Sequence, residues 1–117
     1  MSISLIIPYP PSVNNYWRHT RTGHYLSKRG RDYKTMIKQI IWFQGVREAL
    51  KGRIQITILM YPPDNRIRDI DNVLKATLDA LGDAGLYEDD SQIDKLIIIR
   101  KVPIKGGKLG ISVDHLE

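Results

Sequence analysis

Apolar and polar residues follow regular patterns along the chain, and these patterns predict four strands and two helices. The period-two alternation is clearest between Arg53 and Tyr61, where isoleucine occupies positions 54, 56 and 58. Pairs of prolines at positions 10–11 and 62–63 close the first two strands, because proline cannot donate to a ladder. The predicted strands are residues 2–7, 53–61, 95–104 and 109–113, the last of them an edge strand.

A polar loop with a turn at residues 22–23 follows the first strand and precedes a segment with helical spacing. Apolar residues from Tyr33 to Ile41 recur every three or four positions in that segment. Ser27 is a suitable N-cap because its hydroxyl oxygen can accept from a free backbone N–H of the first turn. A helix is therefore predicted from Ser27 to about Gln44.

The second helix is predicted from about Asp71, as its N-cap, to Leu81, because Leu74 and Leu78 share an apolar stripe with Leu81. Glycines at 82 and 85 signal its end. The resulting order β-α-β-α-β-β predicts an α/β (α+β) fold with a single mixed four-stranded sheet and two helices. We expect one domain that spans residues 1–117.

The composition narrows the class of protein. With 117 residues and 42% hydrophobic residues, the chain can bury one core but is small for a self-sufficient enzyme, so we expect help from a second subunit. The absence of cysteine excludes disulfides and thiolate metal sites. No apolar run approaches the ~20 residues that a membrane helix needs, and the first residues lack the basic start of a signal peptide. We therefore expect a soluble, cytoplasmic protein.

Charge is distributed unevenly along a chain whose net charge is +5 and whose pI is about 9.6. Nine of the thirteen acidic residues lie between Asp64 and Asp94. The segment from Trp17 to Lys38 carries seven basic residues and only one acid, with Tyr16, Trp17 and Tyr25 among or beside them. This pattern predicts contact with the phosphate backbone of a nucleic acid, with aromatic rings stacking on bases. The alternative is a solvated surface.

The acidic segment predicts a metal site. Asp69 and Asp71 are two residues apart, and a third acidic position follows the second helix at Asp89 and Asp90. Carboxylate oxygens suit Mg²⁺, and Mn²⁺ in its place. Only one of the two adjacent aspartates needs to face the ion, because neighbours in an extended stretch point to opposite sides. Lys75 follows Asp71 by four residues and could stabilise charge that develops on a phosphate.

Simpler structural roles remain open for the same residues. Asp71 could only cap its helix, or could only form an ion pair with Lys75. The three histidines, at 19, 24 and 115, fit no zinc signature. No serine has a recognisable His/Asp relay, and no glycine-rich phosphate loop follows a strand.

Two acidic motifs occur in order along the chain. The element D-x-D-N-x-x-K, from Asp69 to Lys75, is followed by D-D-x-Q from Asp89 to Gln92. In these motifs the chain resembles the RusA family of Holliday-junction resolvases. The residues around Pro8–Ser12 resemble the family's N-terminal loop, and those around Lys105–Gly107 resemble its closing hairpin. The resemblance covers nearly the whole chain in order. Where a member of that family has a denser arginine run, this chain has Asn-Arg-Ile-Arg at 65–68.

The resemblance implies a small homodimeric endonuclease that binds four-way DNA junctions and makes paired nicks with Mg²⁺ or Mn²⁺. It implies that Asp69, Asp71 and Asp90 are the catalytic metal ligands, with Asp89 the less favoured choice, and that Lys75 is an essential basic side chain near the cleaved phosphate. Together with the basic segment, it predicts a set of DNA-contacting residues. These are Asn14, Asn15, Tyr16, Trp17, Arg18, Arg21, Lys28, Arg29, Arg66 and Arg68.

Two other functions stay open at this point. One is a non-catalytic protein that binds DNA or stabilises junctions, whose acids are helix caps and solubilising groups. The other is a nuclease for flaps or other branched DNA. A dimer suits junction resolution because a two-fold protein presents two identical sites to a two-fold substrate.

Overall fold

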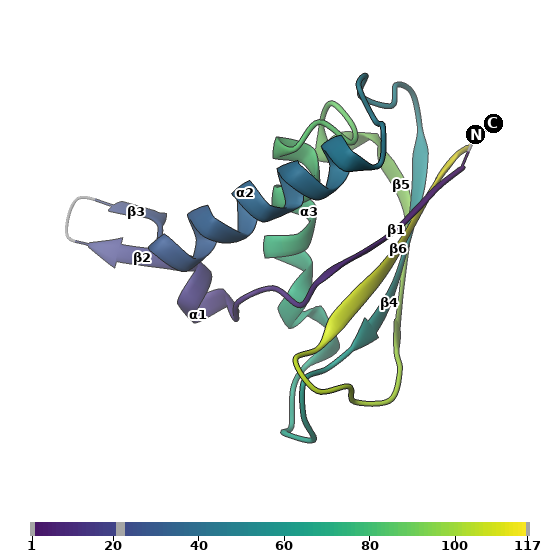
Figure 1. Cartoon of the computed structure of the whole chain (residues 1–117). Helices are drawn as coiled ribbons and strands as arrows, with labels where there is room; N and C mark the ends of the chain where they lie inside the picture. The colour runs from purple at the N-terminus through teal and green to yellow at the C-terminus, as the bar shows by residue number, and fades with distance from the viewer. Residues whose placement is uncertain (1, 21–22, 117) are drawn as a thin grey trace.

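The computed structural model describes residues 2–20 and 23–116, and its centre is a four-stranded sheet in the order β1-β6-β4-β5 (Figure 1). Strands β4 and β5 run parallel, whereas β6 is antiparallel to both β1 and β4, so the sheet is mixed as predicted. A parallel pair needs a long crossover connection, which here contains helix α3. The strands are β1 (Ser2–Pro8), β4 (Ile54–Tyr61), β5 (Ile93–Arg100) and β6 (Lys108–His115).

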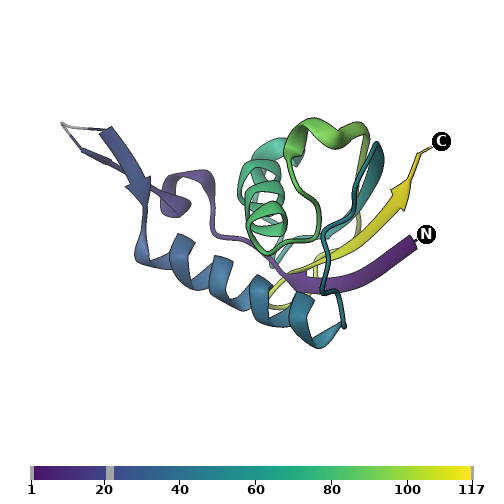
Figure 2. The ribbon, with the colours of Figure 1, turned by 90° about the horizontal axis from the view of Figure 1, so that it is seen from above.

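Two helices, α2 (Lys28–Phe43) and α3 (Leu74–Asp83), cover one face of the sheet (Figures 1 and 2). The core lies between these helices and the sheet, where every second residue of β4 from Ile54 to Met60 is fully buried. Ile37 of α2 and Leu81 of α3 pack into the same core. The helix prediction is confirmed for both segments. Within the described part of the chain, no helix has the length and apolar character needed to cross a membrane.

The start of α2 follows the predicted local chemistry. Ser27 has an extended backbone, and its hydroxyl oxygen accepts from the N–H of Gly30 at 3.0 Å. The same hydroxyl donates to the carbonyl of Tyr16 at 3.1 Å. Ser27 therefore caps the helix and also ties it to the preceding segment.

The prediction for the final strand is wrong in one respect, because β6 is not at an edge. It lies between β1 and β4, and the edges of the sheet are β1 and β5. Alternating burial from Leu109 to Val113 is the same for a central antiparallel strand as for an edge strand, so the pattern could not distinguish them. Strand β5 also starts and ends earlier than predicted.

The predicted polar loop before α2 contains secondary structure instead. It forms a short helix, α1 (Val13–Tyr16), and a two-stranded hairpin of β2 (Trp17–Thr20) and β3 (Gly23–Leu26). The hairpin projects away from the sheet at the start of α2 (Figure 1). Its strands are four residues each, too short for a periodic signal.

Replacing Gly30 by alanine is expected to destabilise the contact between α1 and α2. A Cβ at position 30 would lie 2.5 Å from the backbone oxygen of Tyr16 and 3.2 Å from a methyl carbon of Leu26. We expect Gly30→Ala to lower the free energy of unfolding by about 1–3 kcal/mol in a urea titration.

The sign of this change is informative, because alanine inside a helix otherwise stabilises by roughly 1 kcal/mol relative to glycine. A Gly30→Ala protein as stable as the unsubstituted one would contradict the close approach of α1.

Candidate functional site

Asp69 and Asp71 flank the first residue of a short 3₁₀ turn, η1 (Ile70–Val73), which leads directly into α3. Asp69 has an extended backbone and caps the turn without a side-chain hydrogen bond. The prediction that Asp71 is the N-cap of the helix is wrong, because Val73 occupies that position. Both aspartates are exposed. Their carboxylates are therefore not used to satisfy the helix start.

Lys75 lies in the first turn of α3, one turn after Asp71, and is exposed. Among the described residues, no ion pair within 4.0 Å involves Asp69, Asp71, Lys75 or Asp90. The expected alternative of an Asp71–Lys75 ion pair is thus not formed. A charge without an internal partner is available for a ligand.

Asp89 and Asp90 have different roles at the 3₁₀ turn η2 (Asp90–Gln92). The Asp89 carboxylate accepts from the N–H of Ser91 at 2.9 Å, and the hydrogen bonds from Ser91 lower the pKa of Asp89. The side-chain oxygen of Gln92 accepts in return from the N–H of Asp89, which completes a capping box. The nitrogen of Gln92 donates to the carbonyl of Leu50. The Asp89 carboxylate is therefore used to cap η2, which supports Asp90 as the predicted metal ligand.

Asp90 lies beside the last turn of α3. Its Oδ1 is 3.6 Å from the position that a Cβ would take on Gly82. Burial and the neighbouring Asp90 carboxylate raise the pKa of Tyr87, whose hydroxyl donates to the carbonyl of Leu78. Asp90 shares a concavity of about 420 Å³ with other residues of α3 and of the loop after it. Its lining is Asp79, Gly82, Asp83, Glu88, Asp89 and Asp90.

The three predicted metal ligands are consequently divided between the two ends of α3. Asp69 and Asp71 precede its first residue, Asp90 lies against its last turn, and a ten-residue helix is about 15 Å long. Within the described residues, no three acidic or histidine side chains come close enough to hold a metal ion. The acidic side chains of one chain, as they lie here, do not fit a three-carboxylate metal site.

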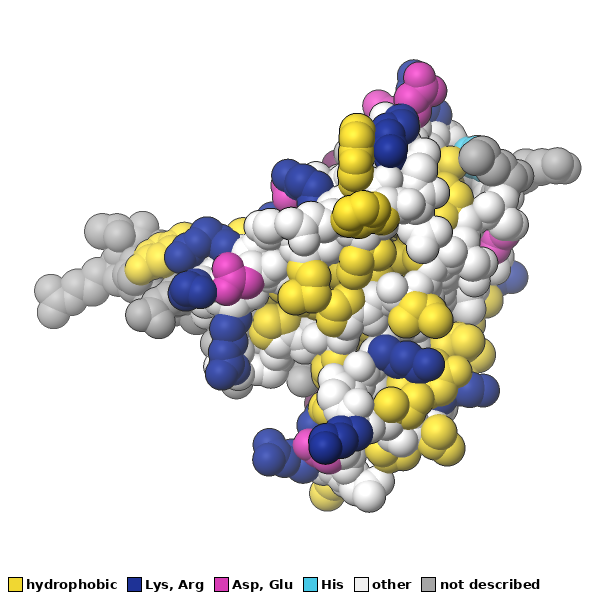
Figure 3. Space-filling view, in the orientation of Figure 1, with side chains coloured by type: hydrophobic (Ala, Val, Ile, Leu, Met, Phe, Trp, Pro, Cys, Tyr) yellow, Lys and Arg dark blue, Asp and Glu magenta, His cyan; other side chains and the backbone are white. Residues whose placement is uncertain are grey.

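Four predicted DNA-contacting residues do come together, around a concavity of about 330 Å³. Asn15 comes from α1, Arg29 from the first turn of α2, and Arg66 and Arg68 from the loop after β4. Figure 3 shows Lys and Arg side chains over the start of α2 and over that loop. The structure thus brings two basic segments together that are far apart in the sequence. We call the space that they line the basic concavity.

Asp64 is part of the same concavity and holds Arg68. Its Oδ1 accepts from the N–H of Arg66 at 3.0 Å and lies 2.7 Å from Nη1 of Arg68. Hydrogen bonds from the Arg68 side chain and the Arg66 backbone lower the pKa of Asp64 to about 2. No role was predicted for Asp64, because its link to Arg68 forms in a segment without helix or strand, where residue spacing carries no periodic signal.

The Asp64 carboxyl is expected to titrate near pH 2 in the folded protein, below the ~3.9 of a free aspartate. Because the folded pKa is lowered, the link to Arg68 is fully present above the ordinary pKa and is lost as pH falls toward 2. Carboxyl ¹³C shifts followed by NMR give this midpoint. Arg68→Ala should return it toward the ordinary value, and an unchanged low midpoint in that variant would contradict the assignment.

Tyr16 does not fit the predicted role in base stacking, because its side chain is completely buried. Its hydroxyl donates to Oδ2 of Asp79 at 2.9 Å, and burial together with this hydrogen bond raises its pKa. Lys34 lies 3.2 Å from the same oxygen. Tyr16, Lys34 and Asp79 therefore join α1, α2 and α3. The prediction of a direct DNA contact by Tyr16 is wrong for this structure.

Two further predicted DNA contacts, Trp17 and Lys28, lie at the start of the hairpin and just after it in the chain. Trp17 is half-buried and packs edge-to-face against Tyr16, with ring centroids 5.3 Å apart. Lys28 is exposed and pairs with Asp32 at 3.0 Å. Arg21 falls outside the described residues, as do the side chains of Asn14 and Arg18.

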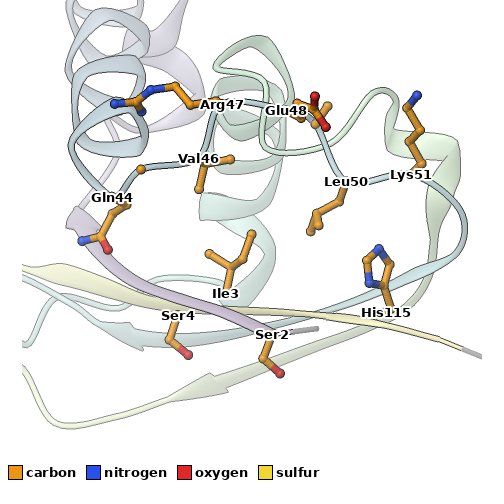
Figure 4. A pocket seen from close by; sticks show the side chains of 12 residues that line it. Ser2, Ile3, Ser4, Gln44, Val46, Arg47, Glu48, Leu50, Lys51 and His115 are labelled. Atoms are coloured by element: carbon orange, nitrogen blue, oxygen red, sulfur yellow. The ribbon is translucent and has the colours of Figure 1, made fainter.

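A separate concavity of about 670 Å³ lies where the ends of β1 and β6 meet the loop after α2 (Figure 4). Its charged and titratable side chains are Arg47, Glu48, Lys51 and His115. It contains none of the predicted site residues. With a single acid in its lining, it offers no carboxylate site.

The comparison with known protein families matches residues 8–114 to the family described as endodeoxyribonuclease RusA. The chain belongs to the RusA family. The matched range includes the predicted metal ligands Asp69, Asp71 and Asp90. It also includes Lys75 and the residues that line the basic concavity. The resemblance seen in the sequence motifs is therefore confirmed.

Individual RusA proteins are similar over almost their whole length. The crossover junction endodeoxyribonuclease of Enterobacteria phage HK97 is 43% identical over 112 residues, which cover 96% of this chain and 93% of the relative. The crossover junction endodeoxyribonuclease of Escherichia coli strain K12 is 34% identical over 113 residues, or 97% and 94% of the two chains. That of Enterobacteria phage 82 is 34% identical over 112 residues, or 96% and 93%.

Proposed function

We propose that this protein is a structure-selective endodeoxyribonuclease that resolves four-way DNA junctions by paired phosphodiester hydrolysis, in recombination and repair in the cytoplasm. The observation that carries the proposal is the pair of exposed carboxylates, Asp69 and Asp71, with Lys75 one turn after Asp71. Among the described residues, neither carboxylate makes a capping hydrogen bond or an ion pair. Membership in a family whose members are named crossover junction endodeoxyribonucleases supports the substrate.

We propose Mg²⁺ as the cofactor, with Mn²⁺ able to substitute, because oxygen ligands suit these ions. Asp69 and Asp71 would hold it together with Asp90. A single chain keeps these residues at opposite ends of α3, so the proposal includes a homodimer in which Asp69 and Asp71 of one subunit meet Asp90 of the other. A two-fold dimer then carries two identical sites for two cuts.

The remaining residues act on the DNA. Lys75 stabilises the negative charge that builds on the phosphate during hydrolysis. In support of this role, its exposed ammonium has no ion partner among the described residues. The basic concavity binds the DNA backbone, where electrostatics gives affinity without reading sequence. The proposed DNA contacts are Asn14, Asn15, Trp17, Arg18, Arg21, Lys28, Arg29, Arg66 and Arg68.

The experiment is a cleavage assay that offers the protein a mobile four-way junction, a flap and a plain duplex, each with Mg²⁺, with Mn²⁺ or with EDTA. We expect the junction to be nicked with either metal, no nicking in EDTA, and little cleavage of the duplex. Preferred cleavage of the flap would indicate a nuclease for other branched DNA. Binding in all conditions without nicking in any would indicate a binding protein and overturn the proposal.

A further inference from the structure

Asp64 lies in the irregular segment between β4 and η1, where no ladder fixes the chain. Its carboxylate contacts two other residues of this segment, Arg66 and Arg68. One oxygen accepts from the backbone N–H of Arg66 and from the guanidinium of Arg68, and the other lies 3.7 Å from Nε of Arg66. The first of these contacts is an Asx turn, which an aspartate makes with the residue two positions later.

Arg68 is held much more firmly than Arg66. Its side chain is 16% exposed, whereas that of Arg66 is 83% exposed. Besides the carboxylate, its Nη1 donates to the backbone oxygen of Asp64 at 3.2 Å. Its own backbone oxygen accepts from Nη2 of Arg100, at the end of β5, at 2.7 Å. Both the guanidinium and the backbone of Arg68 are therefore fixed.

The fixed guanidinium belongs to the basic concavity and directly precedes Asp69 in the chain. Arg29 and Asn15 line the same concavity from α2 and α1. A flexible arginine loses conformational entropy when it binds a phosphate, while one already held in place loses less. A partner that holds an arginine in place can therefore strengthen the binding of a phosphate by that arginine, even when the partner is negatively charged.

We propose that Asp64 is a positioning residue for junction binding, which acts through Arg68 by holding its guanidinium toward the DNA backbone beside the cleavage site. This rests on the proposed function. We expect the removal of this negative charge near the DNA to weaken binding, which is the opposite of the usual effect. If Asp64 were only a negative charge near the DNA, its neutralisation would strengthen binding. If it positions Arg68, its neutralisation weakens binding.

The test measures junction affinity in EDTA by fluorescence anisotropy for Asp64→Asn and Asp64→Ser. Both new side chains can still accept from the N–H of Arg66, so the turn survives while the ion pair is lost. We expect affinity to fall about three- to tenfold in both variants. Asp114→Asn is the matched control, because it removes the same charge from the sheet face opposite the helices, and its affinity should not fall.

The decisive arm repeats Asp64→Asn in an Arg68→Ala background. There we expect no further loss, because the side chain through which Asp64 acts is gone. A loss of equal size in both backgrounds would assign Asp64 a purely structural role, and stronger or unchanged binding by Asp64→Asn would assign it none in positioning. Either result overturns the inference while the unsubstituted protein still binds and nicks the junction. Failure of the unsubstituted protein to do so overturns the proposed function, and this inference with it.

Discussion

Asp71→Asn is expected to abolish nicking of a four-way junction while leaving junction binding intact. The substitution keeps the size of the side chain and removes one negative oxygen from the proposed metal site, at a position where the described residues show no capping hydrogen bond or ion pair. We expect the single-turnover nicking rate to fall on the order of a thousandfold, the scale reached when a group that stabilises developing charge is lost. The measurement is a single-turnover time course with Mg²⁺ at saturating protein.

Asp114→Asn is the control for the change in net charge, because Asp114 lies on the face of the sheet that the helices do not cover. This control protein should nick the junction at the unsubstituted rate. Thermal unfolding of Asp71→Asn should match that of the unsubstituted protein, because the carboxylate makes no described ion pair. Nicking within a few-fold of normal by a folded Asp71→Asn protein would remove Asp71 from the site.

Mixing two inactive proteins, Asp71→Asn and Asp90→Asn, is expected to restore nicking. In a mixed dimer one site collects both substitutions, and the other combines an intact Asp69 and Asp71 with an intact Asp90 from the other subunit. Random exchange at equal concentrations makes half of the dimers mixed, with one good site each, so about a quarter of the sites recover. Each mixed dimer cuts once, so nicked junctions should accumulate in place of resolved duplexes.

The control mixture is Asp69→Asn with Asp71→Asn, which should stay inactive because every site then lacks one of these two aspartates. Subunit exchange is verified by native mass spectrometry of differently tagged chains. If verified mixed dimers of Asp71→Asn and Asp90→Asn stay inactive, each site is built within one chain. The separation across α3 would then have to close on DNA binding, and the shared site would be wrong.

Sequence patterns predicted those parts of the fold that depend on local chemistry. The buried positions of β4 follow from period-two alternation, and the start of α2 follows from the hydroxyl of Ser27. The central place of β6 depends instead on pairing with β1, more than a hundred residues away in the chain. Nothing local to β6 distinguishes that place from an edge.

The candidate site shows the same division between local and distant information. Asp69, Asp71 and Lys75 are close in the sequence and remain close in space. Asp90 was expected beside them, yet its position depends on how residues 84–89 fold back along α3. An aromatic side chain such as that of Tyr16 can either pack in a core or stack on a base. Only its packing against α2 and α3 shows that Tyr16 belongs to the core.

The most direct test of junction resolution labels each of the four strands of a mobile junction in turn and maps the cuts on a denaturing gel with Mg²⁺. We expect two nicks at symmetry-related points in two strands of the same polarity, absent in EDTA and absent with Asp71→Asn. Cuts scattered over all four strands, or cuts that persist with Asp71→Asn, would contradict the proposed function.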